Sequence, residues 1–243
     1  MTPRVAIRAT ALVLAALGIV VGLTLYFSSE KTPPCLVSGV ARWKAPTDAQ
    51  RHRFEVVVPD GALCFFDMDD RQQLTGALAL PGINGITAIS PRPGGKLALR
   101  YADGRGAIVD LTTRAVQRGV EAPPAADGTA RRSLSPDGRE LWVLDARQNT
   151  IHVFAASGKS KIADIRLTRR LSGDESPCSD RPCARTGSLQ HSNDGRFVYV
   201  GDSGDVFDAK RHEQVANLEA LRNSHLTIEV DWIGGKPAFA GTR

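Results

Sequence analysis

The longest uninterrupted hydrophobic stretch of the chain lies near its beginning. Residues Ala9 to Phe27 are nineteen consecutive positions without a charged side chain. A helix of that length is about 28 Å long, close to the ~30 Å hydrocarbon core of a bilayer. Arg4 and Arg8 precede the stretch, and the positive-inside rule keeps such residues in the cytoplasm. The pattern predicts a single-pass protein of the cytoplasmic (inner) membrane, with residues 1–8 in the cytoplasm and a transmembrane signal-anchor helix over 9–27.

The alternative interpretation of this segment is a cleaved signal peptide. The apolar run exceeds the usual length of about 7–15 residues for a signal core, and no A-x-A-like cleavage site follows Phe27. These features favour an anchor that is retained. Residues 28–34 then form a short stalk, stiffened by Pro33 and Pro34. Residues 35–243 form a domain that we expect on the periplasmic or extracellular side.

Beyond the stalk, short apolar runs alternate with polar residues and end at Gly, Pro, Asp or Asn, which is typical of strands and tight turns. Three segments share a small polar turn, a Gly, a basic residue and an alternating strand: Ile89–Arg100, Leu134–Asp145 and His191–Asp202. Their serines Ser90, Ser135 and Ser192 lie 45 and 57 residues apart. Self-similarity at this period indicates a repeat architecture.

Each copy is followed by a second strand–turn–strand segment: Ala107–Val116, Ile151–Ile162 and Asp205–Val215. An earlier, incomplete copy lies at Leu63–Leu74, and a further hairpin is predicted at about 226–240. Two consecutive hairpins make a four-stranded sheet, which cannot bury both faces alone and must stack on its neighbours. A radial stack of such sheets is a β-propeller.

The segments SPDGRELWVLDARQNTIHVF (135–154) and NDGRFVYVGDSGDVFDAK (193–210) resemble blades of the YVTN-repeat β-propeller family and, more loosely, of the WD40-like group. The resemblance covers about residues 84–240 and, more weakly, 36–83. It implies an all-β fold, a small β-propeller of about 4–5 four-stranded blades, after one N-terminal transmembrane helix. Family members commonly have six to eight blades. This chain departs from them, so the ring is either closed by its N- and C-terminal strands or an incomplete arc that a partner completes.

The net charge of +5 is spread thinly along the chain. The segment before residue 35 supplies +2 of it, and elsewhere Lys and Arg occur singly or in pairs. A nucleic-acid-binding surface needs a clustered basic face. The sequence therefore predicts no nucleic-acid partner.

All four cysteines follow the predicted membrane span, which fits an oxidising compartment. Cys178 and Cys183, in the loop SPCSDRPC, predict a local disulfide, because no further Cys or His ligand for a metal lies in that loop. A Cys35–Cys64 disulfide would fasten the end of the stalk to the first strands. A buried free thiol is the alternative for Cys64, which sits in an apolar strand.

No catalytic or cofactor-binding motif is present: the chain has no nucleophile elbow, zinc-protease helix, phosphate loop, haem attachment site or dinucleotide fingerprint. We therefore expect no cofactor. Asp202, Asp205 and Asp208 are candidate calcium ligands, although hairpin-turn chemistry also explains them. Glu229 and Asp231 point to one face of the predicted closing strand, where they would line a channel or keep an edge strand soluble.

These features favour a non-catalytic binding or assembly module, an accessory subunit that meets other envelope membrane proteins near the bilayer surface. The first alternative is a propeller enzyme, either a lactonase-like hydrolase or a quinone-linked dehydrogenase. The second is a binder of glycan or another envelope polymer, for which Trp43 is the aromatic candidate on a loop.

Overall fold

The computed structural model describes residues 34–36, 39–83, 85–124, 130–171 and 187–239, and within them the repeated motif forms the same turn twice. The hydroxyl oxygen of Ser135 accepts a hydrogen bond from the backbone N–H five residues later (2.9 Å) and donates one to Asp137 (2.6 Å). Ser192 and Asp194 repeat both contacts, at 2.9 and 2.7 Å. The glycine after each aspartate has a φ of +71° or +70°, a conformation that favours glycine. The motif therefore encodes the turn between the first two strands of a sheet.

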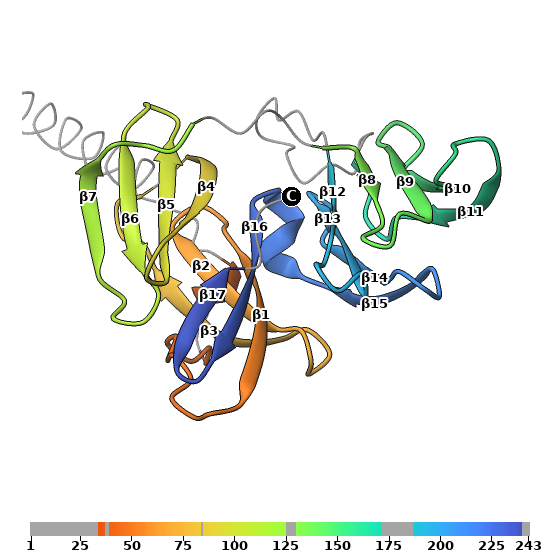
Figure 1. Cartoon of the computed structure of the whole chain (residues 1–243). Helices are drawn as coiled ribbons and strands as arrows, with labels where there is room; N and C mark the ends of the chain where they lie inside the picture. Colours follow the sequence, from red (N-terminus) through yellow and green to blue (C-terminus); the bar gives the residue numbers. More distant parts are fainter. Residues whose placement is uncertain (1–33, 37–38, 84, 125–129, 172–186, 240–243) are drawn as a thin grey trace, which may run out of the picture. The chain divides into compact units, whose positions relative to one another are not determined.

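Hairpins join the strands of the described residues into four antiparallel sheets, all within the unit Pro33–Arg243 (Figure 1). The second sheet contains β4 (Ile86–Arg92), β5 (Lys96–Tyr101), β6 (Gly106–Asp110) and β7 (Val116–Val120). The third contains β8 (Arg132–Leu134), β9 (Glu140–Asp145), β10 (Thr150–Ala155) and β11 (Lys161–Arg166). The fourth contains β12 (Ser188–His191), β13 (Phe197–Gly201), β14 (Asp205–Asp208) and β15 (Glu213–Asn217). The predicted all-β, propeller-like organisation of four-stranded antiparallel sheets is thus confirmed.

The first sheet combines strands from opposite ends of the described chain. It contains β1 (Arg51–Val57), β2 (Ala62–Asp67) and β3 (Gln73–Ala79), together with β16 (Thr227–Ile233) and β17 (Lys236–Phe239). The order is β17-β16-β1-β2-β3, and Figure 1 shows β16 and β17 in dark blue beside the orange β1. The predicted C-terminal hairpin therefore supplies the strand position that β4, β8 and β12 occupy in the other sheets. Short 3-10 turns lie at Pro34–Leu36 and Glu219–Asn223.

Three hydrophobic clusters hold neighbouring sheets together. The first lies between the first and second sheets and centres on Trp43, Phe65 and Trp232. The second joins the first sheet to the fourth, and the third joins the fourth sheet to the third. The first and fourth sheets are thus packed on both faces. Among the residues that the structure describes, no such cluster joins the second sheet to the third.

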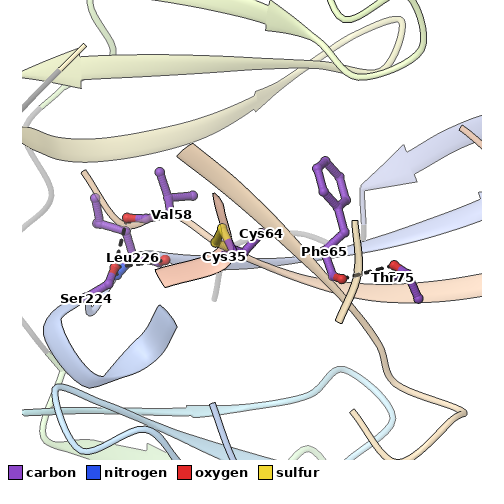
Figure 2. Close-up of a disulfide and its surroundings, with 7 residues drawn as sticks. All are labelled: Cys35, Val58, Cys64, Phe65, Thr75, Ser224 and Leu226. Atoms are coloured by element: carbon purple, nitrogen blue, oxygen red, sulfur yellow. Dashed lines mark hydrogen bonds between the residues drawn. A yellow bond between two sulfur atoms is a disulfide. The ribbon is translucent and has the colours of Figure 1, made fainter. Parts of the chain in front are cut away.

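A disulfide between Cys35 and Cys64 fixes the start of the described chain to β2 (Figure 2). The two Cα atoms are 5.8 Å apart, and both residues are fully buried in the cluster between the first and fourth sheets. The Ser224 hydroxyl donates a hydrogen bond to the carbonyl oxygen of Val58, which directly follows β1 (2.9 Å). This bond links the segment before β16 to the end of β1. The predicted Cys35–Cys64 bridge is confirmed, and the alternative of a free thiol at Cys64 is wrong.

The predicted membrane segment, residues 9–27, lies outside the described residues, as do Arg4 and Arg8, on which its predicted orientation rests. Across the ranges that the structure does describe, no helix has the length and apolar character needed to cross a bilayer.

Candidate functional site

The third sheet has two unlike faces. Trp142 and Leu144 of β9 and Ile151 and Val153 of β10 point toward the fourth sheet and belong to the cluster between them. Because side chains alternate along a strand, the intervening residues point the other way. On β8, Ser133 bonds to His191 of the fourth sheet, so its neighbours on the strand also point away from that sheet. We call this second face, which turns away from the fourth sheet, the outer face.

The strand register lines up apolar side chains across the outer face. Leu134 lies opposite Leu141, and Leu141 lies opposite Phe154. Ile162 follows at the bulge where β10 and β11 shift register. Leu134 and Ile162 are 53% and 49% exposed, and the two central residues are half-buried. We call these four residues the apolar row. None of them belongs to the hydrophobic clusters found among the described residues.

A hollow of about 360 Å³ opens at the end of the third sheet where β9 turns into β10, and residues of both faces line it. Its lining includes Val143 and His152, which lie in the adjacent row of side chains, together with Arg131, Asp145 and Arg147. The His152 Nδ1 atom is 2.5 Å from the Asp164 carboxylate, which also accepts a hydrogen bond from Lys161 Nζ (2.9 Å). The Lys161 and His152 contacts lower the pKa of Asp164.

The charge around the outer face is mainly basic. Asp145 is already used by its own turn, because its Oδ1 atom accepts the backbone N–H groups of the two residues at the tip (2.9 and 3.0 Å). Asp164 is shared between His152 and Lys161. Further basic side chains at the border are Arg131, Arg132 and Arg166. An apolar surface with this border fits an apolar segment that carries acidic residues.

The opposite face of the third sheet is held against the fourth sheet by buried polar and aromatic contacts. Trp142 is fully buried, and its Nε1–H donates to the Glu140 carboxylate at 2.9 Å. The same carboxylate contacts His212 Nε2 (3.1 Å) on the fourth sheet, and the Ser133 hydroxyl lies 2.7 Å from His191 Nδ1. The rings of His191 and His212 pack edge-on against Trp142. These contacts fix the third sheet on the fourth and hold the outer face in one geometry.

The predicted calcium ligands serve separate structural partners. Asp205 is fully buried and accepts hydrogen bonds from Thr168 N, Gln214 Nε2 and Asn217 Nδ2 at 2.7–2.9 Å. Asp208 caps its own hairpin turn, and Asp202, at a φ of +65°, accepts from Gly187 N. Within the described ranges, no three Asp, Glu, His or Cys residues are grouped so that they could hold a metal ion.

Glu229 and Asp231 lie on β16, which is flanked by β1 and β17 and is not an edge strand. The interpretation of these residues as a soluble edge is therefore wrong. They instead face the fourth sheet, beside a buried charge cluster that sequence reasoning missed. Its centre is Arg53, whose guanidinium binds both Asp69 (Nε to Oδ2, 3.0 Å) and Asp194. The alternation of charged residues at Arg51, Arg53 and Glu55 along β1 is the signal that could have revealed it.

Trp43 does not offer an aromatic face to a ligand. It is 1% exposed, its ring stacks on Phe65 at 3.7 Å between centroids, and its Nε1–H donates to the Leu111 carbonyl (3.0 Å). Its prediction as an exposed aromatic residue for glycan binding is wrong, because it fills the space between the first two sheets. Trp142, Tyr199 and Trp232 also pack between sheets. Cys178 and Cys183 lie outside the described residues, so their predicted disulfide stays a prediction.

Comparison with known proteins adds little to this geometry. No family model matches the chain, and no curated protein matches it. A solved structure described as dihydro-heme d1 dehydrogenase NirN in complex with DHE is 16% identical, with a TM-score of 0.25. The match covers 78% of this chain and 48% of that one, so this chain spans about half the length of the matched structure.

Proposed function

We propose that this chain is a small, membrane-anchored β-propeller related to the YVTN-repeat and WD40-like group, and that it is a non-catalytic binding module. Its partner is another protein of the cell envelope, which docks on the outer face of the β8–β11 sheet. The observation that carries this proposal is the apolar row, Leu134, Leu141, Phe154 and Ile162, which crosses all four strands and belongs to no described core cluster.

The exposed ends of the row support a docking surface because apolar area that stays in contact with water costs free energy. A buried apolar side chain contributes about 1.5–3 kcal/mol relative to an exposed one. Exposed apolar residues that occur singly are ordinary, whereas a contiguous apolar row with a polar border is typical of an interaction site. The basic border and the adjoining hollow favour a partner segment with apolar residues and acidic flanks.

The anchor and the disulfide support the envelope location. Residues 9–27 have the length of a membrane span, and Arg4 and Arg8 orient it with the domain outside the cytoplasm. The Cys35–Cys64 bridge suits an oxidising compartment. Cys35 directly follows the proposed 28–34 stalk, so the bridge lies at the start of the proposed extracytoplasmic domain.

Site-specific photo-crosslinking in native membranes tests the proposed surface. A photoreactive residue at Leu134 or Ile162 is expected to give one discrete adduct. The matched controls are Ile233 and Val215, which are 51% and 44% exposed and lie on other sheets. Adducts at all four positions, or only at the controls, would contradict the proposal.

A charge reversal then tests the chemistry of the partner. Arg131→Glu with Arg132→Glu is expected to abolish the Leu134 adduct, because it removes the basic border beside the row while leaving the packed back face intact. Soluble apolar peptides with acidic flanks are expected to compete for the adduct, and the same peptides with basic flanks are not. Equal competition by both peptides would show that the border does not select the partner.

A further inference from the structure

Two glutamates face each other where the ends of the described chain meet. Glu55 of β1 lies directly opposite Glu229 of β16 in the antiparallel register. Directly opposed residues point to the same face of a sheet, with Cβ atoms about 4.5–5.5 Å apart. Here that face packs against the fourth sheet, and the two side chains are only 1% and 3% exposed. Like charges in such a pair destabilise a sheet in water and more strongly in a buried site.

The two carboxyl groups differ in their hydrogen bonds. One oxygen of Glu229 accepts the backbone N–H of Asn193, in the β12–β13 turn, at 2.7 Å. Both oxygens of Glu55 are buried, and neither accepts a hydrogen bond from the residues that the structure describes. An ionised carboxylate is almost never buried without a partner, whereas the neutral acid carries no net charge to solvate.

The neighbouring guanidinium of Arg53 does not neutralise Glu55, because it already binds two other carboxylates. Arg53, two residues earlier on β1, directs its guanidinium to Asp69 and Asp194. Asp231 pairs with Arg51 (2.7 Å) at the exposed end of the same face. The charged and titratable groups around the pair, from every element packed against it, are Arg53 on β1, Asp69 in the β2–β3 turn, Asp231 on β16, Asp194 and Arg196 in the β12–β13 turn, and Tyr199 on β13.

We infer that Glu55 and Glu229 form a buried proton-binding site, in which one proton is held at neutral pH with Glu55 as the protonated carboxylic acid. The bound proton is part of the junction between the first and fourth sheets. The site needs no metal or cofactor, and the inference does not depend on the proposed docking function.

The electrostatic environment agrees with this geometry. Burial raises the pKa of Glu55 well above its ordinary range, and the neighbouring charge of Glu229 raises it further. Burial also raises the pKa of Glu229, partly offset by the Asn193 N–H. Burial, followed by the charge of Glu55, raises the pKa of the Tyr199 hydroxyl, which donates to Gln72 (3.2 Å) and stays neutral.

The sign of the resulting pH dependence follows from linkage. A carboxyl whose folded pKa is raised stabilises the fold fully below its ordinary value of 4.5. That stabilisation is lost as the pH rises from there through the raised value. Asp69 acts in the opposite sense, because its lowered pKa matters only in acid. The two effects therefore occupy different pH windows and can be measured separately.

The test compares the full-length wild-type chain with Glu55→Gln and Glu229→Gln, and uses Glu213→Gln, at an exposed position on β15, as the matched control. Infrared difference spectra report protonated carboxylic acids directly. At pH 7 the wild type and the control are expected to show the carbonyl band of a buried acid, and Glu55→Gln is expected to lack it. Thermal unfolding from pH 5 to pH 9 gives the second measurement.

For the wild type, the unfolding equilibrium constant is expected to rise by up to tenfold per pH unit above pH 5 until the pair ionises. Glu55→Gln should flatten this slope and unfold at a higher temperature than the wild type at pH 9. A wild-type spectrum without the acid band at pH 7 would overturn the inference, even if the variants fail to fold. An unchanged slope in folded Glu55→Gln would overturn it as well.

Discussion

At the scale of single residues, the Arg53 cluster shows how a charge is kept inside a sheet interface. Arg53 is 7% exposed, yet its planar fork meets the Asp69 carboxylate with two parallel hydrogen bonds and reaches Asp194 with its remaining nitrogen. The Asp69 and Asp194 contacts raise the pKa of the guanidinium further above its already high value. The fork thus connects the first sheet to the β12–β13 turn of the fourth.

We expect Arg53→Ala to destabilise the domain by about 2–3 kcal/mol, because it removes several charge-assisted hydrogen bonds and leaves their acceptors at a packed interface. Arg51→Ala is the matched control. Arg51 is on the same strand and pairs with Asp231, but its side chain is 59% exposed, so the loss should be below about 1 kcal/mol. Urea unfolding at pH 7 measures both changes, and equal losses would contradict the assigned role of burial.

The same cluster predicts a loss of stability in acid. The Arg53 hydrogen bond lowers the pKa of Asp69 below its ordinary value of 3.8. A lowered folded pKa stabilises the fold above the unfolded value and loses that contribution as the pH falls through the folded value. The stability difference between wild type and Arg53→Ala should therefore shrink between pH 4 and pH 2. A difference that stays constant over this range would argue against the ion pair with Asp69.

At the scale of elements, the disulfide acts on the segment that leads into the first sheet. It closes a loop between residues 29 positions apart and ties the Pro34–Leu36 turn to β2. Cross-linking a loop of this length stabilises a fold by roughly 3–4 kcal/mol in the chain-entropy model. Cys35→Ser with Cys64→Ser should lower the free energy of unfolding by about that amount. Denaturant titration of the double variant against the oxidised wild type checks this value, and an unchanged midpoint would contradict it.

The hairpin turns could be predicted from the sequence because their contacts are local. Contacts between residues far apart in the sequence could not. The Ser-x-Asp-Gly turns at Ser135 and Ser192 follow from side chains within five residues, so the sequence alone locates them. The pairing of Glu55 with Glu229 joins positions more than 170 residues apart, and no local pattern specifies it. Trp43 was misassigned for the same reason, because its partners Phe65 and Leu111 come from two different sheets.

The sequence predicted the strands of the outer face but not which of their two faces stays uncovered. Alternation in Leu134–Asp145 predicted a strand with two faces, but both faces of that strand carry apolar residues. Which face is covered depends on Trp142 meeting His191 and His212 of the fourth sheet. The apolar row therefore emerges only when the register of four strands and the position of the neighbouring sheet are known together.

At the scale of the whole molecule, the proposed membrane anchor determines where the outer face can act. We expect an alkaline phosphatase fused after Arg243 to be active, because that reporter folds only outside the cytoplasm. Arg4→Glu with Arg8→Glu should sharply reduce that activity, since it removes the positive charge that orients the span. A cytoplasmic reporter fused at the same position serves as the control with opposite sign. Equal activity of the two reporters in the wild type would contradict the predicted orientation.

The pairing of β1 with β16 has a consequence for biosynthesis. β1 emerges from the ribosome about 175 residues before β16, the strand that pairs with its open edge. At about 5–20 residues per second, that interval is on the order of 10–30 s. Throughout it, the nascent first sheet presents unpaired backbone N–H and C=O groups next to apolar side chains, which is the form of a strand most prone to pair with other chains. Correct folding of this protein therefore depends on preventing the incomplete first sheet from pairing with other chains. Chaperones that shield β1 should affect its yield more than those that act on the completed chain.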